Sequence, residues 1–104
     1  MRAYVDKRHT PSYVSFMVFA WRNEKNELLK HTRGIGFEKV VIHIEKGNIL
    51  DIVEHPNKRK YSNQKMYVLN IDDYAHIVPF EGKDGKRELK TIFPSRVATK
   101  QYLR

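Results

Sequence analysis

The chain has 104 residues, enough for one hydrophobic core and too few for two domains, and its 40% hydrophobic and 31% charged residues are typical of a globular protein. It contains no cysteine, which excludes disulfides, thiolate metal sites and a cysteine nucleophile. No apolar run approaches the roughly 20 residues of a membrane span, and the N-terminus lacks the apolar segment of a signal peptide. The sequence therefore predicts a cytoplasmic protein with no membrane partner.

Positive charge is concentrated at the C-terminal end of the chain. The formal net charge is +8, and residues 83–104 alone hold seven basic and two acidic residues, a local balance of +5. This bias favours a polyanionic partner, with nucleic acid first and an acidic protein segment second. A basic protein that is merely soluble is the alternative interpretation.

The first residues differ in pattern from the rest of the chain. Residues 1–15 are polar, contain Pro11 and show no periodicity, so we expect a flexible N-terminal arm followed by a single domain over residues 16–104. The apolar, aromatic run over residues 16–21 has the length of a strand and predicts that the domain begins with one.

Two helices are predicted next. Asn23 is suited to cap the first, over residues 24–31. The second has the clearest amphipathic pattern in the chain, and Gly47 ends it. Its apolar positions follow the spacing of one helix face: Phe37, Val40, Val41 and Ile44.

From residue 49 the pattern changes to strands, predicted over 49–54, 66–71, 74–80 and 88–93. Asp72 and Asp73 predict a tight hairpin between the second and third of these. Pro79 conflicts with a central position for its strand, because proline cannot donate to a ladder. The order of elements predicts an α+β fold. We expect an antiparallel sheet of about four to five strands, two N-terminal helices packed on one face and a short C-terminal helix on that same face.

The segment from residue 88 to 104 joins the last predicted strand to a terminal helix. Alternation along this strand predicts that one set of side chains faces the core: Leu89, Thr91 and Phe93. The other set is expected to face outward: Glu88, Lys90 and Ile92. Pro94 is expected to end the ladder, and Ser95 to cap the helix.

Ser95 and Arg96 form a predicted phosphate-binding helix N-terminus. The backbone N–H groups of residues 96–98 have no intrahelical partner, and the helix dipole favours an anion beside them. The Arg96 guanidinium adds two parallel donors for a phosphate. The alternative is an ordinary capped helix with a solvated arginine.

Metal and cofactor sites are not predicted. The five histidines are scattered, without a paired spacing or a carboxylate at ligand spacing, and no glycine-rich phosphate loop occurs. We therefore expect neither a metal nor a cofactor.

The remaining basic and phenolic groups suit metal-free cleavage of RNA, in which a 2′-hydroxyl attacks the adjacent phosphate. Histidine exchanges protons near neutral pH, so His55 is the predicted proton-transfer residue. Arg96 and Lys90 are predicted to stabilise the charged phosphorane. Binding of RNA is assigned to Lys58, Arg59, Lys60, Tyr61, Lys100 and Tyr102. The alternative is a solvated basic loop with no phosphate partner.

Several short stretches resemble the BrnT-type toxins of bacterial toxin-antitoxin modules, which are small ribonucleases with a RelE-like fold. The matching segments cover most of residues 17–103 and comprise Phe19 to Trp21, Glu24 to Asn26, Leu29 to His31, Gly34 to Glu38, and Leu89 to Tyr102 with Pro94, Ser95, Arg96 and Ala98. The chain departs from the family at Thr32 and Arg33, which follow His31 in place of glycine, and at Asn23, which replaces an acidic residue. Of the site residues, only Arg96 is carried over from the family pattern.

The resemblance implies a toxin that cleaves RNA without a metal and is neutralised by a cognate antitoxin protein. A non-catalytic RNA-binding or protein-interaction module with the same fold is the alternative. A transcriptional co-regulator that binds DNA only with its partner is a third possibility.

Overall fold

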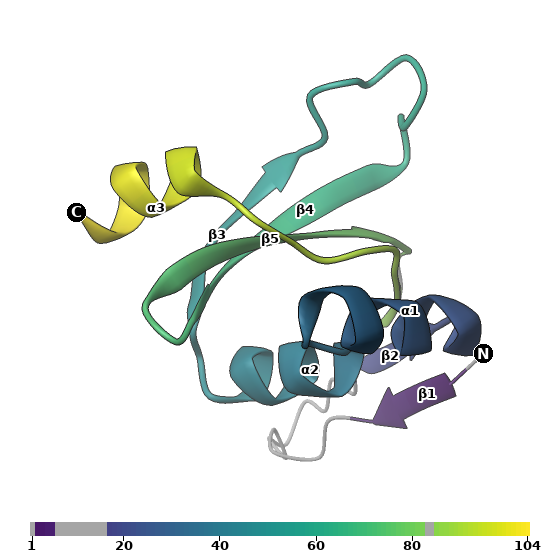
Figure 1. Ribbon diagram of the computed structural model, residues 1–104. Coiled ribbons are helices and arrows are strands. Elements are labelled where there is room, and N and C mark those ends of the chain that lie inside the picture. Colours follow the sequence, from purple (N-terminus) through teal and green to yellow (C-terminus); the bar gives the residue numbers. More distant parts are fainter. Residues whose placement is uncertain (1, 6–16, 83–84) are drawn as a thin grey trace, which may run out of the picture.

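The computed structural model describes residues 2–5, 17–82 and 85–104, which form three helices and one seven-stranded sheet (Figure 1). This confirms the α+β class. In chain order the elements are β1 (Arg2–Val5), β2 (Val18–Trp21), α1 (Asn23–Arg33), α2 (Phe37–Glu45), β3 (Ile49–Glu54), β4 (Gln64–Ile71), β5 (Tyr74–Glu81), β6 (Lys86–Leu89), β7 (Phe93–Pro94) and α3 (Arg96–Leu103).

The sheet is mixed, in contrast to the antiparallel sheet of four to five strands that we predicted. Its order is β1-β2-β6-β5-β4-β3, with β7 also paired to β5. The run from β3 to β6 is the predicted antiparallel meander. β2 joins it in parallel beside β6. The two helices and the meander lie between β2 and β6 in the chain, and a connection of this length can bring a strand back in the same direction.

Part of the predicted N-terminal arm belongs to the sheet. Residues 2–5 form β1, which pairs antiparallel with β2, from Arg2 opposite Trp21 to Val5 opposite Val18. This pairing differs from the flexible arm expected over residues 1–15, and β1 contains Tyr4 and Val5, residue types that favour strands. Residues 6–16 lie outside the described residues, so the arm prediction is not tested there.

The predicted strand over residues 88–93 is interrupted. β6 ends at Leu89 and β7 begins at Phe93, and the Lys90 N–H donates to the Pro79 carbonyl at 2.8 Å. In a strand the N–H and C=O of one residue point to the same side. The Pro79 carbonyl accepts from Lys90 at the break, so the side on which Pro79 lacks an N–H also faces the break. The break lets proline occupy a buried position of β5. It also reverses the predicted alternation, because Ile92 is fully buried.

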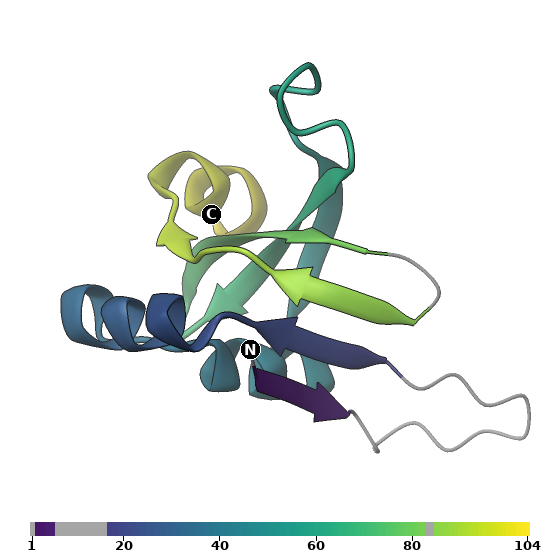
Figure 2. The same ribbon diagram turned by 90° about the vertical axis from the view of Figure 1, so that its right-hand side faces the viewer.

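The helices cover both faces of the sheet, so the prediction that all three lie on one face is wrong. Along β4, Tyr67, Leu69 and Ile71 belong to the core beneath α1 and α2, whereas Val68 belongs to a second core beneath α3. Figure 2 shows α3 on one side of β4 and β5 and the other two helices on the opposite side. Successive side chains of a strand point to opposite faces, and β4 carries apolar residues on both.

Local signals account for several boundaries. The predicted apolar face of α2 is buried, and its helix ends before Gly47, which has a φ of +80°. Asp72 and Asp73 form the predicted tight hairpin, both with positive φ. Asn23 is not the cap of α1. Arg22 holds that position without a side-chain hydrogen bond, and Asn23 is the first helical residue.

Candidate nucleic-acid interface

The N-terminus of α3 has the predicted cap. The Ser95 hydroxyl accepts a hydrogen bond from the Ala98 N–H at 3.0 Å. This bond changes one detail of the predicted phosphate site, because only the Arg96 and Val97 N–H groups then remain for an anion. Arg96 is exposed. No hydrogen bond or ion pair engages its guanidinium within the described part of the chain.

Thr99 attaches the first turn of α3 to β5. Its hydroxyl donates to the Ser95 carbonyl at 2.7 Å and accepts from the Ala75 N–H at 2.9 Å, and the side chain is buried. The Ser95 N–H also donates to the Ala75 carbonyl at 2.9 Å. These bonds attach the strand-to-helix segment to β5 and set the position from which Arg96 projects.

Tyr102 holds the last turn of α3 to the edge strand β3. Its hydroxyl donates to the Asp51 carboxylate at 2.6 Å, and its ring packs against the core beneath α3. This hydrogen bond raises the pKa of Tyr102 above its usual range. Since the hydroxyl and part of the ring are engaged, the stacking of Tyr102 on a base stays a prediction.

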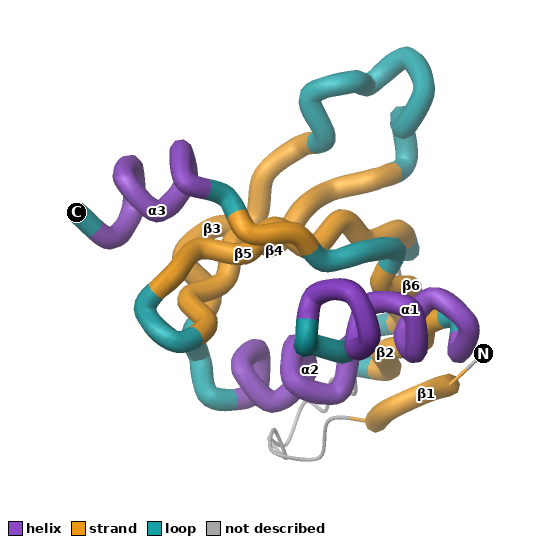
Figure 3. The backbone as a smooth tube through the Cα atoms, in the orientation of Figure 1, coloured by secondary structure: helices purple, strands orange, loops and turns teal. Residues whose placement is uncertain are grey.

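The loop over residues 55–63 extends beyond the ends of β3 and β4 (Figure 3). The rings of His55 and Tyr61 lie against each other, with centroids 4.4 Å apart and planes tilted by 36°, and the Lys60 ammonium lies 5.3 Å from the Tyr61 ring. The Asn57 N–H donates to His55 Nδ1 at 3.1 Å. Because Nδ1 accepts this bond, Nε2 is the ring nitrogen of His55 left for a ligand, and the proton-transfer role of His55 stays a prediction.

All but one of the cations of α3, of Arg104 and of this loop lack a carboxylate partner within the described residues. Lys58 pairs with Glu54 at 3.3 Å. No ion pair within the described residues engages the others, which are Arg59, Lys60, Arg96, Lys100 and Arg104. Figures 1 and 2 place α3 and the loop on the same upper side of the sheet. We call this surface, defined by residues 55–61 and α3, the basic surface.

Lys90 lies elsewhere. Its ammonium donates to the Glu88 carboxylate at 3.0 Å, and both line a cavity of about 430 Å³ with Arg22 and Lys25 near the start of α1. Helix α1 and helix α3 cover opposite faces of the sheet. No hydrogen bond or ion pair joins His55, Lys90 and Arg96 to one another in the described part of the chain. The structure therefore does not bring the three predicted catalytic residues together, and their catalytic roles stay predictions.

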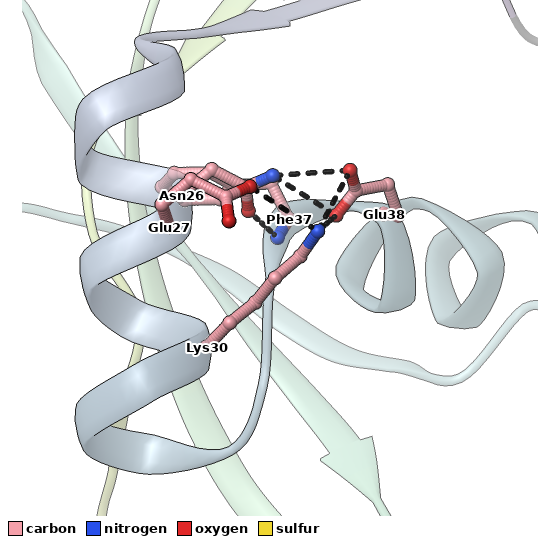
Figure 4. A network of polar contacts seen from close by, with 5 residues as sticks. All are labelled: Asn26, Glu27, Lys30, Phe37 and Glu38. Atoms are coloured by element: carbon pink, nitrogen blue, oxygen red, sulfur yellow. Dashed lines mark hydrogen bonds and ion pairs between the residues drawn. The ribbon is translucent and has the colours of Figure 1, made fainter.

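Several residues that carry the family resemblance form a polar junction between α1 and α2 (Figure 4). The Asn26 side chain is fully buried, and its Oδ1 accepts from the Phe37 N–H at 2.7 Å. Its Nδ2 donates to both oxygens of Glu38 at 3.0 Å, and Lys30 Nζ lies 3.4 Å from the same carboxylate. Asn26 thus caps α2 from the neighbouring helix, because Gly36 at the cap position has no side chain.

The contacts of the junction also change the pKa of the Glu38 carboxyl. Burial opposes the charged form of Glu38, but the hydrogen bond from Asn26, a backbone hydrogen bond and the nearby Lys30 outweigh it, so the pKa of Glu38 is lowered. These contacts indicate a structural role for Asn26, Lys30 and Glu38.

One arrangement of side chains that could bind a ligand was not predicted from the sequence. Arg87 is half-buried, donates to the Tyr67 hydroxyl and lies over the Phe80 ring at 4.9 Å. A signal was present, because Arg87 shares the inward-facing set of β6 with Leu89, where a charged residue is unusual.

No protein-family model matches this chain, and neither a curated protein nor a solved structure matches it. The resemblance to BrnT-type toxins and the RelE-like fold therefore remain hypotheses. Within the described ranges, no helix is long and apolar enough to cross a membrane. No group of three or more histidines and carboxylates in that part of the chain is placed to hold a metal ion.

Proposed function

We propose that this protein binds single-stranded RNA on its basic surface and cleaves it without a metal ion. The observation that supports this proposal is the loop in which the His55 and Tyr61 rings lie 4.4 Å apart, with the Lys60 ammonium beside Tyr61 and no ion pair to Lys60 within the described residues. Proteins that bind single strands combine a positively charged surface with aromatic side chains on which bases stack. The acidic groups at the edge of this surface, Asp51 and Glu54, are already engaged by Tyr102 and Lys58.

In the proposed reaction the 2′-oxygen forms a bond to phosphorus and the bond from phosphorus to the 5′-oxygen breaks. The products are a 2′,3′-cyclic phosphate and a 5′-hydroxyl. The proton of the 2′-hydroxyl passes to water, and the 5′-oxygen takes a proton from water. Arg96 donates to the non-bridging oxygens of the phosphorane.

We further propose that the protein is the cytoplasmic toxin of a toxin-antitoxin module. Its antitoxin would neutralise it with an acidic or amphipathic segment that covers α3 and the loop over residues 55–63. The resemblance described above and the unpaired charge of the basic surface support this part of the proposal. A hydrogen-exchange footprint of a purified complex that left both segments exposed would contradict it.

One observation favours a second candidate, a non-catalytic module that binds RNA or a protein. His55, Lys90 and Arg96 lie on different elements, and Lys90 is paired with Glu88. Such a module would keep the basic surface without assembling a catalytic centre. The two candidates differ in whether bound RNA is cut.

The experiment measures binding and cleavage of a model RNA in EDTA by the full chain and by matched variants. Arg96→Ala should lower the cleavage rate on the order of a hundredfold and leave unfolding within about 0.5 kcal/mol of the parent. Arg96→Lys should restore little, because an ammonium lacks the two parallel donors of the guanidinium. Lys90→Ala should change the rate less than Arg96→Ala does.

Arg33→Ala is the control, since it removes the same charge from the last turn of α1, outside the basic surface. RNA affinity should also fall steeply with rising salt, as counterion release requires. Binding without cleavage would favour the second candidate. Cleavage that appears only with a divalent ion, or an Arg96→Ala variant as active as the parent, would contradict the proposed mechanism.

A further inference from the structure

Arg87 projects from β6 into the core side of the sheet and is held there by aromatic rings. Its guanidinium carbon lies 4.9 Å from the centre of the Phe80 ring and 5.6 Å from that of Tyr67, and it donates to the Tyr67 hydroxyl. The two rings themselves are 4.5 Å apart. Packing on both rings fixes the plane of the guanidinium, so little rotamer freedom is left to lose on binding a ligand.

This cation has no counter-ion among the described residues. No carboxylate of that part of the chain lies within ion-pair distance of Arg87, which is half-buried. A partly buried charge without a partner is costly, because the charge has lost water without gaining an opposite charge. An anion bound at this position would remove that cost.

Arg87 and Tyr67 line a cavity of about 170 Å³. Its other walls are apolar: Met17, Phe19, Ile44, Ile49 and Ile52. The cavity is smaller than the roughly 300–1,000 Å³ of pockets that enclose a whole small molecule. It therefore fits one group of a longer chain better than a complete ligand.

We propose that Arg87 and Tyr67 form a subsite for one phosphate group of an RNA chain, with apolar walls that contact the attached nucleoside. The proposal rests on the RNA binding proposed above and adds a second contact region to it. Arg87 gives one donor to Tyr67 and retains its remaining N–H groups for the ligand. Because Tyr67 accepts that bond, its own O–H remains able to donate to a ligand oxygen.

The chemistry of the two side chains favours a phosphate over a carboxylate. Burial raises the pKa of the Tyr67 hydroxyl despite the nearby Arg87, so it stays protonated and donates. A guanidinium and a hydroxyl together present donors to more oxygens than the two of a carboxylate. A phosphate with several acceptor oxygens matches this set.

The position of β3 connects this subsite to the basic surface. β3 is an edge strand, with Ile49 and Ile52 lining the cavity and Leu50 and Val53 packed in the core beneath α3. A strand of RNA that crosses the edge of β3 can therefore contact α3 on one face and Arg87 on the other. No rearrangement of the sheet is required.

The test measures binding of a single-stranded 2′-O-methyl RNA oligonucleotide, which lacks the nucleophile and cannot be cut. Arg87→Met keeps an unbranched apolar side chain over Phe80 and should weaken binding about tenfold or more. It should also reduce the slope of log affinity against log salt by about 1. Tyr67→Phe keeps the ring and should weaken binding about two- to tenfold. Arg33→Met, which removes a charge from α1, is the matched control.

Thermal melting checks that each variant is folded, and Tyr67→Phe retains a test if Arg87→Met does not fold. Arg87→Met and Tyr67→Phe variants that bind as the control does would overturn the subsite. If Arg96→Ala still weakened binding, the proposed function would survive that result. Failure of the parent protein to bind RNA would overturn both. If an acidic peptide of Asp and Glu, and not the oligonucleotide, shifted the Arg87 Nε–H resonance, the cavity would be a protein-docking site and the proposal would be wrong.

Discussion

The α1–α2 junction and the basic surface differ in whether their polar side chains have partners. At the junction, the buried Asn26 amide, the Glu38 carboxylate and the Phe37 N–H satisfy one another within hydrogen-bond distance. On the basic surface, Arg96 and Lys100 have no partner among the described residues. Satisfied buried polar groups specify a fold, whereas unpaired cations gathered on one side of a sheet are suited to bind a polyanion.

This difference changes how the family resemblance is interpreted. Trp21 packs on Phe37 with ring centroids 5.7 Å apart, and the Phe37 N–H donates to the Asn26 side chain. These residues, with Lys30 and Glu38, lie in the segments that resemble BrnT-type toxins, yet their contacts are structural. Arg96, the one site residue carried over from the family pattern, lies instead on the basic surface. Similarity at the junction is therefore informative about folding and carries little information about chemistry.

The largest expected effect on stability is that of Asn26→Ala. The substitution leaves the buried Phe37 N–H without an acceptor and removes the two Asn26 hydrogen bonds to Glu38, so we expect a loss of about 2–4 kcal/mol in the free energy of unfolding. Urea denaturation measures the loss. Asn23→Ala is the matched control on the same helix and should stay within about 0.5 kcal/mol, because Asn23 is exposed and makes no cap bond. Equal losses would show that the junction has no special role.

Gly36→Ala should have the next largest effect, through a steric clash. A Cβ at Gly36 would lie 2.7 Å from Asn26 Oδ1 and 2.9 Å from Glu38 Oε1. We expect a loss of about 1–3 kcal/mol, measured from the denaturation midpoint. Gly34 offers a contrast, since a Cβ there meets open space while its φ is +71°. Gly34→Asn should therefore be tolerated, because asparagine adopts that conformation, whereas Gly36→Asn should not.

Ser95→Ala tests a structural contact within the basic surface. Loss of the hydrogen bond to the Ala98 N–H should cost about 1 kcal/mol in thermal or urea unfolding. RNA affinity, measured under conditions where the variant is fully folded, should fall much less than it does in Arg96→Ala. If Ser95→Ala and Arg96→Ala weakened RNA binding equally, the α3 N-terminus would contribute through its conformation and not through the guanidinium.

The smallest expected effect concerns the pH dependence of the junction. The pKa of Glu38 is lower in the folded chain than in the unfolded chain, so its contribution to stability is complete above the unfolded value and is lost as pH falls through the folded value. Because the side chain is partly exposed, we expect a loss of less than about 1 kcal/mol. Glu38→Gln should remove this component from the acid limb of a stability curve. An unchanged acid limb would contradict the assignment.

Much of the fold was predictable where a local pattern had a single outcome. The spacing of Phe37, Val40, Val41 and Ile44 predicted α2, and Asp72 with Asp73 predicted the hairpin. The Ser95 cap was also predicted and is confirmed. The prediction of a continuous strand over residues 88–93 was wrong, because the position of Pro79 on the neighbouring strand decides where β6 ends.

Of the candidate site, the sequence by itself determined the residue types and their concentration in two segments, since charge and side-chain chemistry belong to each residue. The tertiary structure alone decided which of these residues share a surface. It placed Lys90 beside α1 and Arg96 on α3, engaged Tyr102 with Asp51, and brought Arg87 together with Tyr67 from strands that are not adjacent in the chain. Such contacts depend on strand order, on which face each strand presents and on where a ladder breaks. These are properties of the assembled sheet, because the free energy of pairing distant strands is shared among many residues and no local pattern contains it.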